Sequence, residues 1–418
     1  MKTYRIIKSI LMLRFALSFV VAAGLLSPVG ALAADRILIG NPECLTGSQA
    51  KAGEQAVAGI KAIVEWVNTT YGGVKVGGQK LPLEYKYYDC ESKKEQVTTL
   101  LEKLITVDKV NFTVAPYSSG LTLAGAPVAD KFGVIYMDHG GASDKIFQQG
   151  YEYVVQTIGP GTRYHVGTLD LLKQVAPNDN RLALAYKDDE FARSVMEGAK
   201  AHAQSLGYQI VFERTYPANV TDLTPILSDL KAANPDIILG GGHFADGQLF
   251  AKQLADLNIK PKALSLVAAV TLPAFKNALG PIANGAMGPS HWEYGVAFSK
   301  EMAEKAGVTW IGPSQDEFVA LFKKAAGKDL MPEYHGAEAG AAILALVLGV
   351  EKADSLDNAK VRKTLGDIKF MSFYGGWDVD ETGKQVGHDM IDAQWQGGAL
   401  KIVWPPAVAT GTLVYPKP

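Results

Sequence analysis

The sequence predicts an α/β protein with two Rossmann-like lobes, each a parallel sheet flanked by helices, joined by a three-strand hinge. Apolar runs of strand length alternate with longer segments whose apolar residues recur at helical spacing. This alternation favours parallel sheets covered by helices. The same pattern starts again at residue 181, and three extended segments, 151–161, 284–295 and 373–385, are candidates for crossing strands. We therefore expect a cleft between the two lobes.

Residues 1–34 are expected to be a secretory signal peptide. Four basic residues precede an apolar run at 15–26, and Ala31-Leu32-Ala33 forms a small-residue cleavage site. The apolar run is too short to span a bilayer, so we expect an exported, soluble mature protein without direct membrane insertion. The segment carries no acidic residue, so its removal makes the chain more acidic than its full net charge of −2. That balance argues against a nucleic-acid partner.

The first half of the chain contains four strand-length runs and two helical segments. The strands are expected at 36–40, 83–88, 111–115 and 134–137, and the helices at 52–73 and 93–105. A Gly-Gly pair ends the first helix. Because parallel sheets bind ligands at the carboxyl ends of their strands, the loops after these strands are expected to face the cleft.

The second half repeats this organisation. The strands are expected at 181–186, 208–216 and 236–241, and the helices at 191–207, 223–235 and 247–258. From the three crossings we place lobe one at 35–158 plus 296–373, and lobe two at 159–295 plus 374–418.

The two cysteines, Cys44 and Cys90, each follow a predicted strand of the first half. In an exported protein, an oxidising compartment allows them to pair. If the two strands are neighbours, the thiols can meet, and we expect one disulfide. The alternative is two separate reduced thiols.

Several short motifs occur in an order that resembles one family. They are LTGSQAKAG (45–53), YGGVKVGGQKL (71–81), YDCESKK (88–94), PYSSG (116–120), GVIYM (133–137), HGGAS (139–143) and QGY (149–151). In this order the chain resembles the leucine/isoleucine/valine-binding protein family, the type I periplasmic solute-binding proteins of ABC importers. The resemblance covers essentially the whole mature chain. It implies a periplasmic receptor with the type I fold and an inner-membrane ABC permease as its partner.

The resemblance also implies where a ligand binds in lobe one. In the family, the serine-rich loop and the Gly-rich turn grip the ligand's carboxylate and its neighbouring polar groups. Here these positions are Ser118 and Ser119, preceded by Tyr117, and Gly141, Ala142 and Ser143. A helix that begins at the serines offers unpaired N–H groups and a partial positive charge to an anion. The alternative is that Ser119 only caps the helix.

Other candidate contacts lie on the cleft rim and in lobe two. Ser48 follows the first strand, and Phe191 and either His243 or Phe244 fall where the family places aromatic residues. Family members that bind amino acids also carry an acid for the ligand's ammonium, but the matching position falls near Ala268 or Ala269.

Two interpretations are possible because the acid that binds the ligand's ammonium in the family is missing here. Either Glu293 or Asp189 supplies the charge, or the ligand is an aromatic or aliphatic carboxylate without an amine. Trp292, beside Glu293, can stack on a flat ring, or it can pack in the hinge.

An enzyme is the remaining alternative, as a secreted hydrolase with Ser118 or Ser119 as nucleophile beside Asp138 and His139. No G-x-S-x-G elbow is present, and the seven histidines show no metal-ligand spacing. We therefore expect a receptor for a small carboxylate, an amino acid or amino-acid-like molecule, with no catalysis, metal or cofactor.

Overall fold

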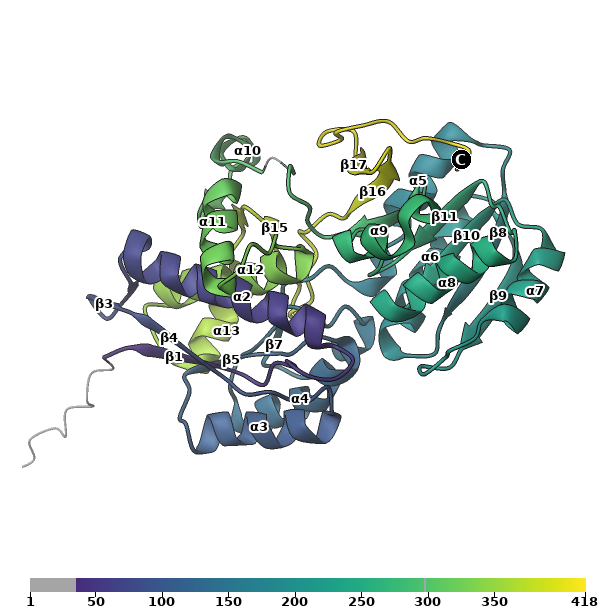
Figure 1. Ribbon diagram of the computed structural model, residues 1–418. Coiled ribbons are helices and arrows are strands. Elements are labelled where there is room, and N and C mark those ends of the chain that lie inside the picture. The colour runs from purple at the N-terminus through teal and green to yellow at the C-terminus, as the bar shows by residue number, and fades with distance from the viewer. Residues whose placement is uncertain (1–34, 297) are drawn as a thin grey trace, which may run out of the picture. The chain divides into compact units, whose positions relative to one another are not determined.

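The computed structural model describes residues 35–296 and 298–418 (Figure 1). The predicted signal peptide, 1–34, lies outside the described residues. Among the residues described, no helix is both long enough and apolar enough to cross a membrane.

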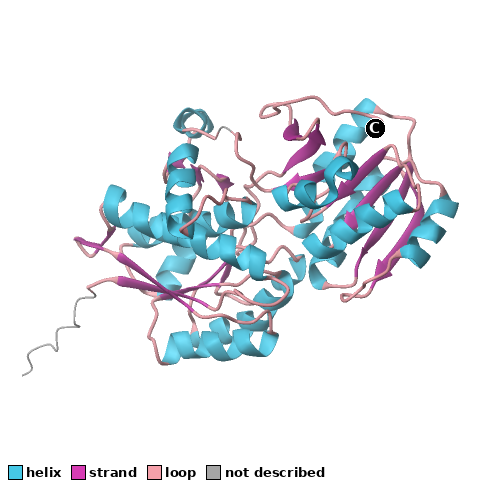
Figure 2. Ribbon diagram, viewed as in Figure 1, coloured by secondary structure: helices cyan, strands magenta, loops and turns pink. Residues whose placement is uncertain are grey.

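The first sheet has five parallel strands in the order β4-β1-β5-β6-β7. Its strands are β1 (Ile37–Asn41), β4 (Leu83–Tyr87), β5 (Phe112–Val114), β6 (Tyr136–Asp138) and β7 (Val154–Gln156). The central strands are buried along their whole length, as expected for a parallel sheet with both faces covered. Figures 1 and 2 show the two helical layers, with α3 (Lys94–Thr106) and α4 (Ser119–Phe132) on one face and α2 (Ala50–Trp66) with α12 (Tyr334–Ala353) on the other.

The second sheet has seven strands in the order β17-β16-β12-β11-β10-β8-β9. Five are mutually parallel, and β16 runs antiparallel to β12 and to β17. The strands are β8 (Arg181–Lys187), β9 (Gln209–Tyr216), β10 (Ile237–Gly241), β11 (Ala263–Leu266), β12 (Met287–Ser290), β16 (Ile391–Gln396) and β17 (Ala399–Trp404). The associated helices are α5 (Val166–Val175), α6 (Glu190–Ser205), α7 (Thr224–Ala233), α8 (Phe244–Asp256) and α9 (Pro273–Leu279).

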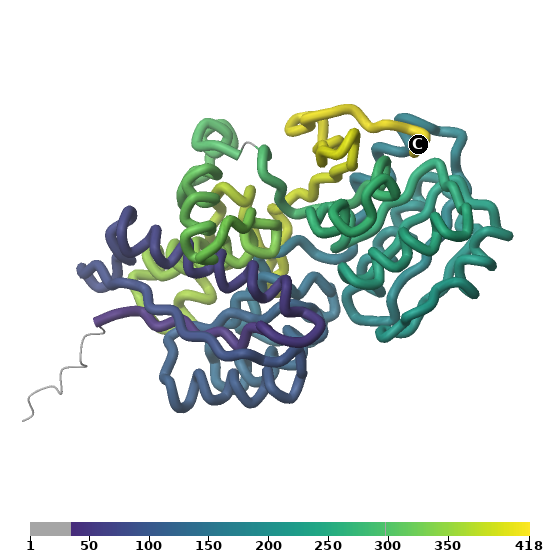
Figure 3. The backbone as a smooth tube through the Cα atoms, in the orientation of Figure 1, coloured from purple at the N-terminus to yellow at the C-terminus, as the bar shows by residue number. Residues whose placement is uncertain are grey.

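The chain passes three times between these two groups of elements (Figure 3). It leaves the first sheet after β7, returns after β12 to the helices around α12, and enters the second sheet again at β16. The elements between β12 and β16 are α10 (Lys300–Ala306), β13 (Thr309–Trp310), α11 (Gln315–Ala326), α12, α13 (Asn358–Asp367), β14 (Phe370–Ser372) and β15 (Gly375–Trp377). The predicted fold class is confirmed. The residue limits assigned to the two lobes stay a prediction.

The remaining elements are short. They are the hairpin strands β2 (Val74–Val76) and β3 (Gln79–Leu81), the π-helical turn η1 (Val67–Tyr71), and the 3₁₀ turns η2 (Asp144–Ile146), η3 (Gly161–Arg163) and η4 (Gly280–Ala283).

Cys44 and Cys90 form a disulfide in the structure, with their Cα atoms 4.6 Å apart. The pairing is possible because β1 and β4 are adjacent parallel strands, so the residues that follow them meet at the same edge of the sheet. Both cysteines are buried against Val97 and Leu121. The bridge therefore ties the loop after β1 to the loop after β4.

Helices α2 and α12 approach each other closely through glycines. A Cβ on Gly59 would lie 1.9 Å from the carbonyl oxygen of Gly336. At such a distance only a residue without a side chain fits, and the contact sets the position of the N-terminal end of α12.

We predict that the double substitution Cys44→Ala and Cys90→Ala lowers the free energy of unfolding by about 2–4 kcal/mol, because the bridge restrains the unfolded chain. Urea unfolding without reductant measures the change, and wild-type protein unfolded with reductant is the matched control. Unfolding at the wild-type urea concentration, or immediate labelling of both native thiols, contradicts the prediction.

We predict that Gly59→Ala destabilises the protein by roughly 1–3 kcal/mol through overpacking, although alanine favours helices over glycine by about 1 kcal/mol. Gly366→Ala in α13 is the control, because its Cβ would meet nothing closer than the Arg362 guanidinium at 3.5 Å. Thermal unfolding of both variants measures the difference. Equal melting temperatures would show that α2 and α12 can move apart freely.

Candidate functional site

A cavity of about 960 Å³ lies where the carboxyl ends of strands from both sheets meet. Its walls come from the segments that follow six parallel strands and from the start of α12. These segments contribute residues between 47 and 55 after β1, Tyr117 after β5, Lys187 at the end of β8, Ala218 and Val220 after β9, residues 243–249 after β10, Ala268 and Leu272 after β11, and Glu333 and His335 at α12. This is the edge at which parallel sheets bind ligands.

The rim after β1 is held in place by Asp89. Its carboxylate accepts hydrogen bonds from the N–H groups of Leu45 and Thr46 and from the Thr46 hydroxyl. Burial opposes the charge of Asp89, but these donors and the N–H of Glu91 still lower its pKa. Ser48 lies on this rim and lines the cavity, as predicted from its place after the strand.

The serine-rich loop forms the start of α4. Ser118 is the N-cap residue and Ser119 is the first residue of the helix. The Ser119 hydroxyl is fully buried and accepts the N–H of Ser143 at 3.1 Å. Ser119 therefore joins the serine-rich loop to the Gly-rich turn, while the first N–H groups of α4 have no partner within the helix. Neither serine is among the residues that line the 960 Å³ cavity, and ligand contact by this pair stays a prediction.

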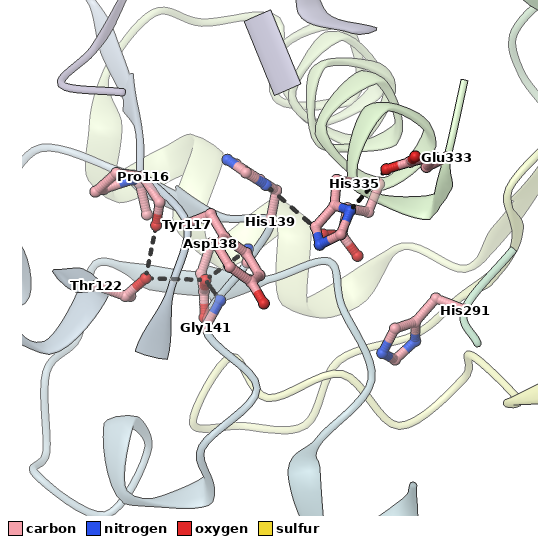
Figure 4. A network of polar contacts seen from close by, with 12 residues as sticks. Pro116, Tyr117, Thr122, Asp138, His139, Gly141, His291, Glu333 and His335 are labelled. Atoms are coloured by element: carbon pink, nitrogen blue, oxygen red, sulfur yellow. Dashed lines mark hydrogen bonds and ion pairs between the residues drawn. The ribbon is translucent and has the colours of Figure 1, made fainter. Parts of the chain in front are cut away.

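The Gly-rich turn is shaped by Asp138, as Figure 4 shows. Its Oδ1 accepts the N–H of Gly141 at 2.6 Å and of Gly140 at 3.2 Å, and the Thr122 hydroxyl lies 3.4 Å away. A Cβ on Gly141 would come within 2.7 Å of the same carboxylate, which explains the glycine. Burial raises the pKa of Asp138 to about 7.

Ala142 takes the next position in this turn and contacts residues of the second half. Its carbonyl oxygen accepts the N–H of Gly161 at 2.5 Å. Its side chain packs in the same buried cluster as Tyr164 and Phe191. Ser143 follows, and its hydroxyl is buried without a hydrogen-bond partner among the described residues.

His243 bridges the two halves. Its Nδ1 lies 3.0 Å from the Tyr117 hydroxyl, and its Nε2 lies 3.1 Å from Oδ2 of Asp189. Phe191 stacks on the imidazole with ring centroids 5.4 Å apart. The other oxygen of Asp189 caps α6 by accepting the N–H of Ala192. Both oxygens of Asp189, one of the two acids proposed for a ligand ammonium, are therefore already engaged.

Phe244, the alternative aromatic candidate, lines the cavity beside His243. The ammonium of Lys51, from α2, lies 4.3 Å from the centre of its ring. The contact is a cation–π interaction between the two halves of the chain.

Trp292 lies in the core, and a contact between Trp292 and a ligand stays a prediction. It is fully buried, donates its indole N–H to the Phe373 carbonyl oxygen at 3.1 Å, and packs edge-on against Phe318 and Phe373. It serves core packing and does not line the cavity. Glu293 accepts the Ser290 hydroxyl at 2.8 Å, and burial raises its pKa to about 8.

Five of the seven histidines lie close to one another or to other residues of the site, and two of the five line the cavity, which the sequence analysis did not anticipate. They are His139, His243, His291, His335 and His388. Each comes from a different segment, so no spacing in the sequence connects them. The sequence feature that could have pointed to this grouping is that His139, His243 and His291 each come within two residues after a strand. No group of histidine, cysteine or acidic side chains within the described ranges could hold a metal ion.

His139 lies between two buried glutamates on different elements. Its Nε2 is 2.9 Å from Oε2 of Glu43, and its Nδ1 is 3.9 Å from Oε1 of Glu338. Burial disfavours the imidazolium, but the two carboxylates raise the pKa of His139 to about 10. Asp138 accepts an N–H group of the Gly-rich turn, and His139 bonds to Glu43. These hydrogen bonds therefore do not link a serine, His139 and Asp138 into a catalytic triad.

The chain was compared with known proteins. The family described as periplasmic binding protein matches residues 36–399. Leu/Ile/Val-binding protein homolog 7 of Brucella suis is 25% identical over 412 residues, which cover 94% of this chain and 98% of the relative.

Two solved structures share the fold. One is the branched-chain amino acid transporter substrate binding protein of Streptococcus pneumoniae in complex with isoleucine, with a TM-score of 0.73 and 19% identity over 88% of this chain and all of that one. The other is a solute binding protein of an ABC transporter from R. palustris in complex with 4-hydroxybenzoate, with a TM-score of 0.72 and 23% identity over 88% and 95%. With a family match over most of its length, the chain belongs to the periplasmic binding protein family, as its motifs indicate.

Proposed function

We propose that this protein is the periplasmic substrate-binding receptor of an ABC transporter and captures a small carboxylate between its two halves. The observation that carries the proposal is the cavity of about 960 Å³ at the carboxyl ends of strands from both sheets. Its volume lies in the range of small-molecule sites. Its lining combines aromatic rings with charged side chains of both signs, among them Lys51, Lys187 and Asp246.

The ligand's carboxylate would bind at the start of α4, directly behind Tyr117, which lines the cavity and precedes the two serines in the chain. The N–H groups there carry partial positive charge, and Ser118 and Ser143 contribute hydroxyls next to them. The Ser119–Ser143 hydrogen bond keeps the loop and the turn together. An anion can be held in this way without a lysine.

Several contacts between the halves support a closing motion over the ligand. Besides the Tyr117–His243 bond, Asp144 accepts the Ser194 hydroxyl at 3.0 Å and the N–H of Thr162 at 3.2 Å. Closure of this kind excludes water and adds contacts from the second half. A ligand shifts the equilibrium only as far as it prefers the closed form. The closed form would be presented to an inner-membrane permease, which supplies the energy for transport.

An amine-free aromatic carboxylate is the second candidate ligand. The observation that favours it is Ala268, which lines the cavity near the place where amino-acid binders of the family carry an acid. The two structural neighbours illustrate both classes, since one holds isoleucine and the other 4-hydroxybenzoate.

Thermal-shift screening of the mature protein tests the function. A ligand that binds only the folded state raises the melting temperature by mass action. We expect a shift with at least one amino acid or aromatic or aliphatic acid. The absence of any shift across these classes, together with turnover of an ester or amide, would overturn the receptor.

We predict that Ser118→Ala weakens binding of the ligand found in this screen about tenfold, since one hydrogen bond to a charged group contributes about 1.5 kcal/mol or more. Isothermal titration calorimetry measures the affinity. Ser228→Ala, in the exposed part of α7, is the matched control and keeps wild-type affinity. Equal affinity of the Ser118 variant and the wild type removes this hydroxyl from the site.

A further inference from the structure

Glu338 in α12 is a buried carboxylate whose oxygens have no hydrogen-bond partner among the described residues. The residue is 0% exposed. Its ion-pair contact is with Nδ1 of His139 at 3.9 Å, which is too long for a hydrogen bond. Burial raises the pKa of Glu338 to about 8, although the nearby imidazole of His139 lowers it, and a bound cation would favour the charged carboxylate in the same way. A buried carboxylate without hydrogen bonds destabilises the folded protein, so its presence needs an explanation.

The position of Glu338 connects it to the cavity. On a helix, residues three and four apart share a face, and Glu338 follows His335 and Tyr334 at these spacings. His335 lines the cavity, and its ring meets that of Tyr117 edge-on at 4.9 Å. Glu338 therefore lies one helical turn beyond the cavity wall, on the same face of α12.

The surroundings of Glu338 suit a cation. Four tyrosines near Glu338 have a pKa that burial raises and that the charge of Glu338 raises further; they are Tyr117, Tyr164, Tyr334 and Tyr374. Aromatic faces and a carboxylate together bind an ammonium group through cation–π attraction and charge-assisted hydrogen bonds. The hydroxyl of Tyr374 is also buried and has no partner within the described ranges.

The other acids near the cavity are already engaged. Asp189 bonds to His243 and caps α6, and Asp246 bonds to the N–H of His243 and the hydroxyl of Tyr216. Glu293 bonds to Ser290, and Glu43 accepts three hydrogen bonds. Glu333 lies at the rim, where one oxygen is 3.7 Å from Nδ1 of His335. Asp138 accepts the N–H groups of the Gly-rich turn through Oδ1, and only its Oδ2 has no partner within the described part of the chain. Glu338 differs from these acids because neither of its oxygens accepts a hydrogen bond among the described residues.

We propose that Glu338 binds the ammonium group of the ligand and selects amine-bearing carboxylates over amine-free ones. The inference rests on the proposed receptor function. It places the counter-charge on α12 of the first half, whereas the strand loop that ends in Ala268 and Ala269 carries no acid. A ligand held at its carboxylate by α4 and at its ammonium by Glu338 is an amino acid or a close analogue.

The test compares each amino acid with the acid that lacks only its amine. Wild-type mature protein, unfolded and refolded to remove bound ligand, is titrated calorimetrically with the standard L-amino acids. The des-amino partners include isocaproate for leucine, hydrocinnamate for phenylalanine and glutarate for glutamate. Benzoate and 4-hydroxybenzoate complete the set. We expect at least one amino acid to bind 30-fold or more tightly than its des-amino partner.

The isosteric variant Glu338→Gln should remove this preference. The amino acid should bind at least 30-fold more weakly, while the affinity for the des-amino acid changes less than threefold. Glu351→Gln is the matched control, because it makes the same change on the same helix at a residue that bonds to Tyr71 outside the site. Circular dichroism checks the fold, and Glu338→Asp, which keeps the charge, should retain part of the preference.

Four results would overturn the assignment. They are binding of only amine-free acids by the wild type, an unchanged preference in Glu338→Gln, an equal loss for both members of a pair, or a loss of preference confined to Glu333→Gln. The first of these leaves the receptor function standing. Absence of binding to every compound overturns the receptor function itself. If Glu338→Gln does not fold, Glu338→Asp decides: a preference weakened relative to the wild type supports the assignment, and an unchanged preference overturns it.

Discussion

The parallel direction of the strands in both sheets is the constraint on which the rest of the structure depends. A parallel strand returns to the same edge through a helix, so the loops that follow the strands all gather at one end of each sheet. In this chain six of the segments that line the cavity are of this kind, and the start of α12 adds the rest of the wall. The serine-rich loop, the Gly-rich turn and the histidine of the second half can contact one another because the topology delivers them to the same place.

Charge burial is the second feature that shapes the site. Glu43, His139 and Glu338 are fully buried and come from segments almost 300 residues apart. Taking such groups out of water is expensive unless they are paired and hydrogen-bonded. Glu43 satisfies this condition through three donors, but Glu338 does not. Because of this difference, we assign a structural role to Glu43 and propose a ligand-binding role for Glu338.

Local sequence identified the elements well because each depends on near neighbours. The start of α4 at Ser119 follows from two hydroxyl residues before a helical segment, and the strands of both sheets follow from short apolar runs. The disulfide was expected because its cysteines come just after two strands, although only the pairing of β1 with β4 brings the thiols together.

By itself the sequence determined the fold class and the family, because these depend on periodicity and on motifs along the chain. Only the tertiary structure decided which side chains meet there. Trp292 and Glu293 come just after β12, as the cavity residues come after their own strands, yet Trp292 packs in the core and Glu293 bonds to Ser290. His335 and Glu338 lie in α12, which no motif in the sequence connected with the site, and the close contact of α12 with α2 puts one on the cavity wall and the other behind it. The physical reason is that burial and pairing are set by contacts between residues far apart in the chain, and no local pattern records them.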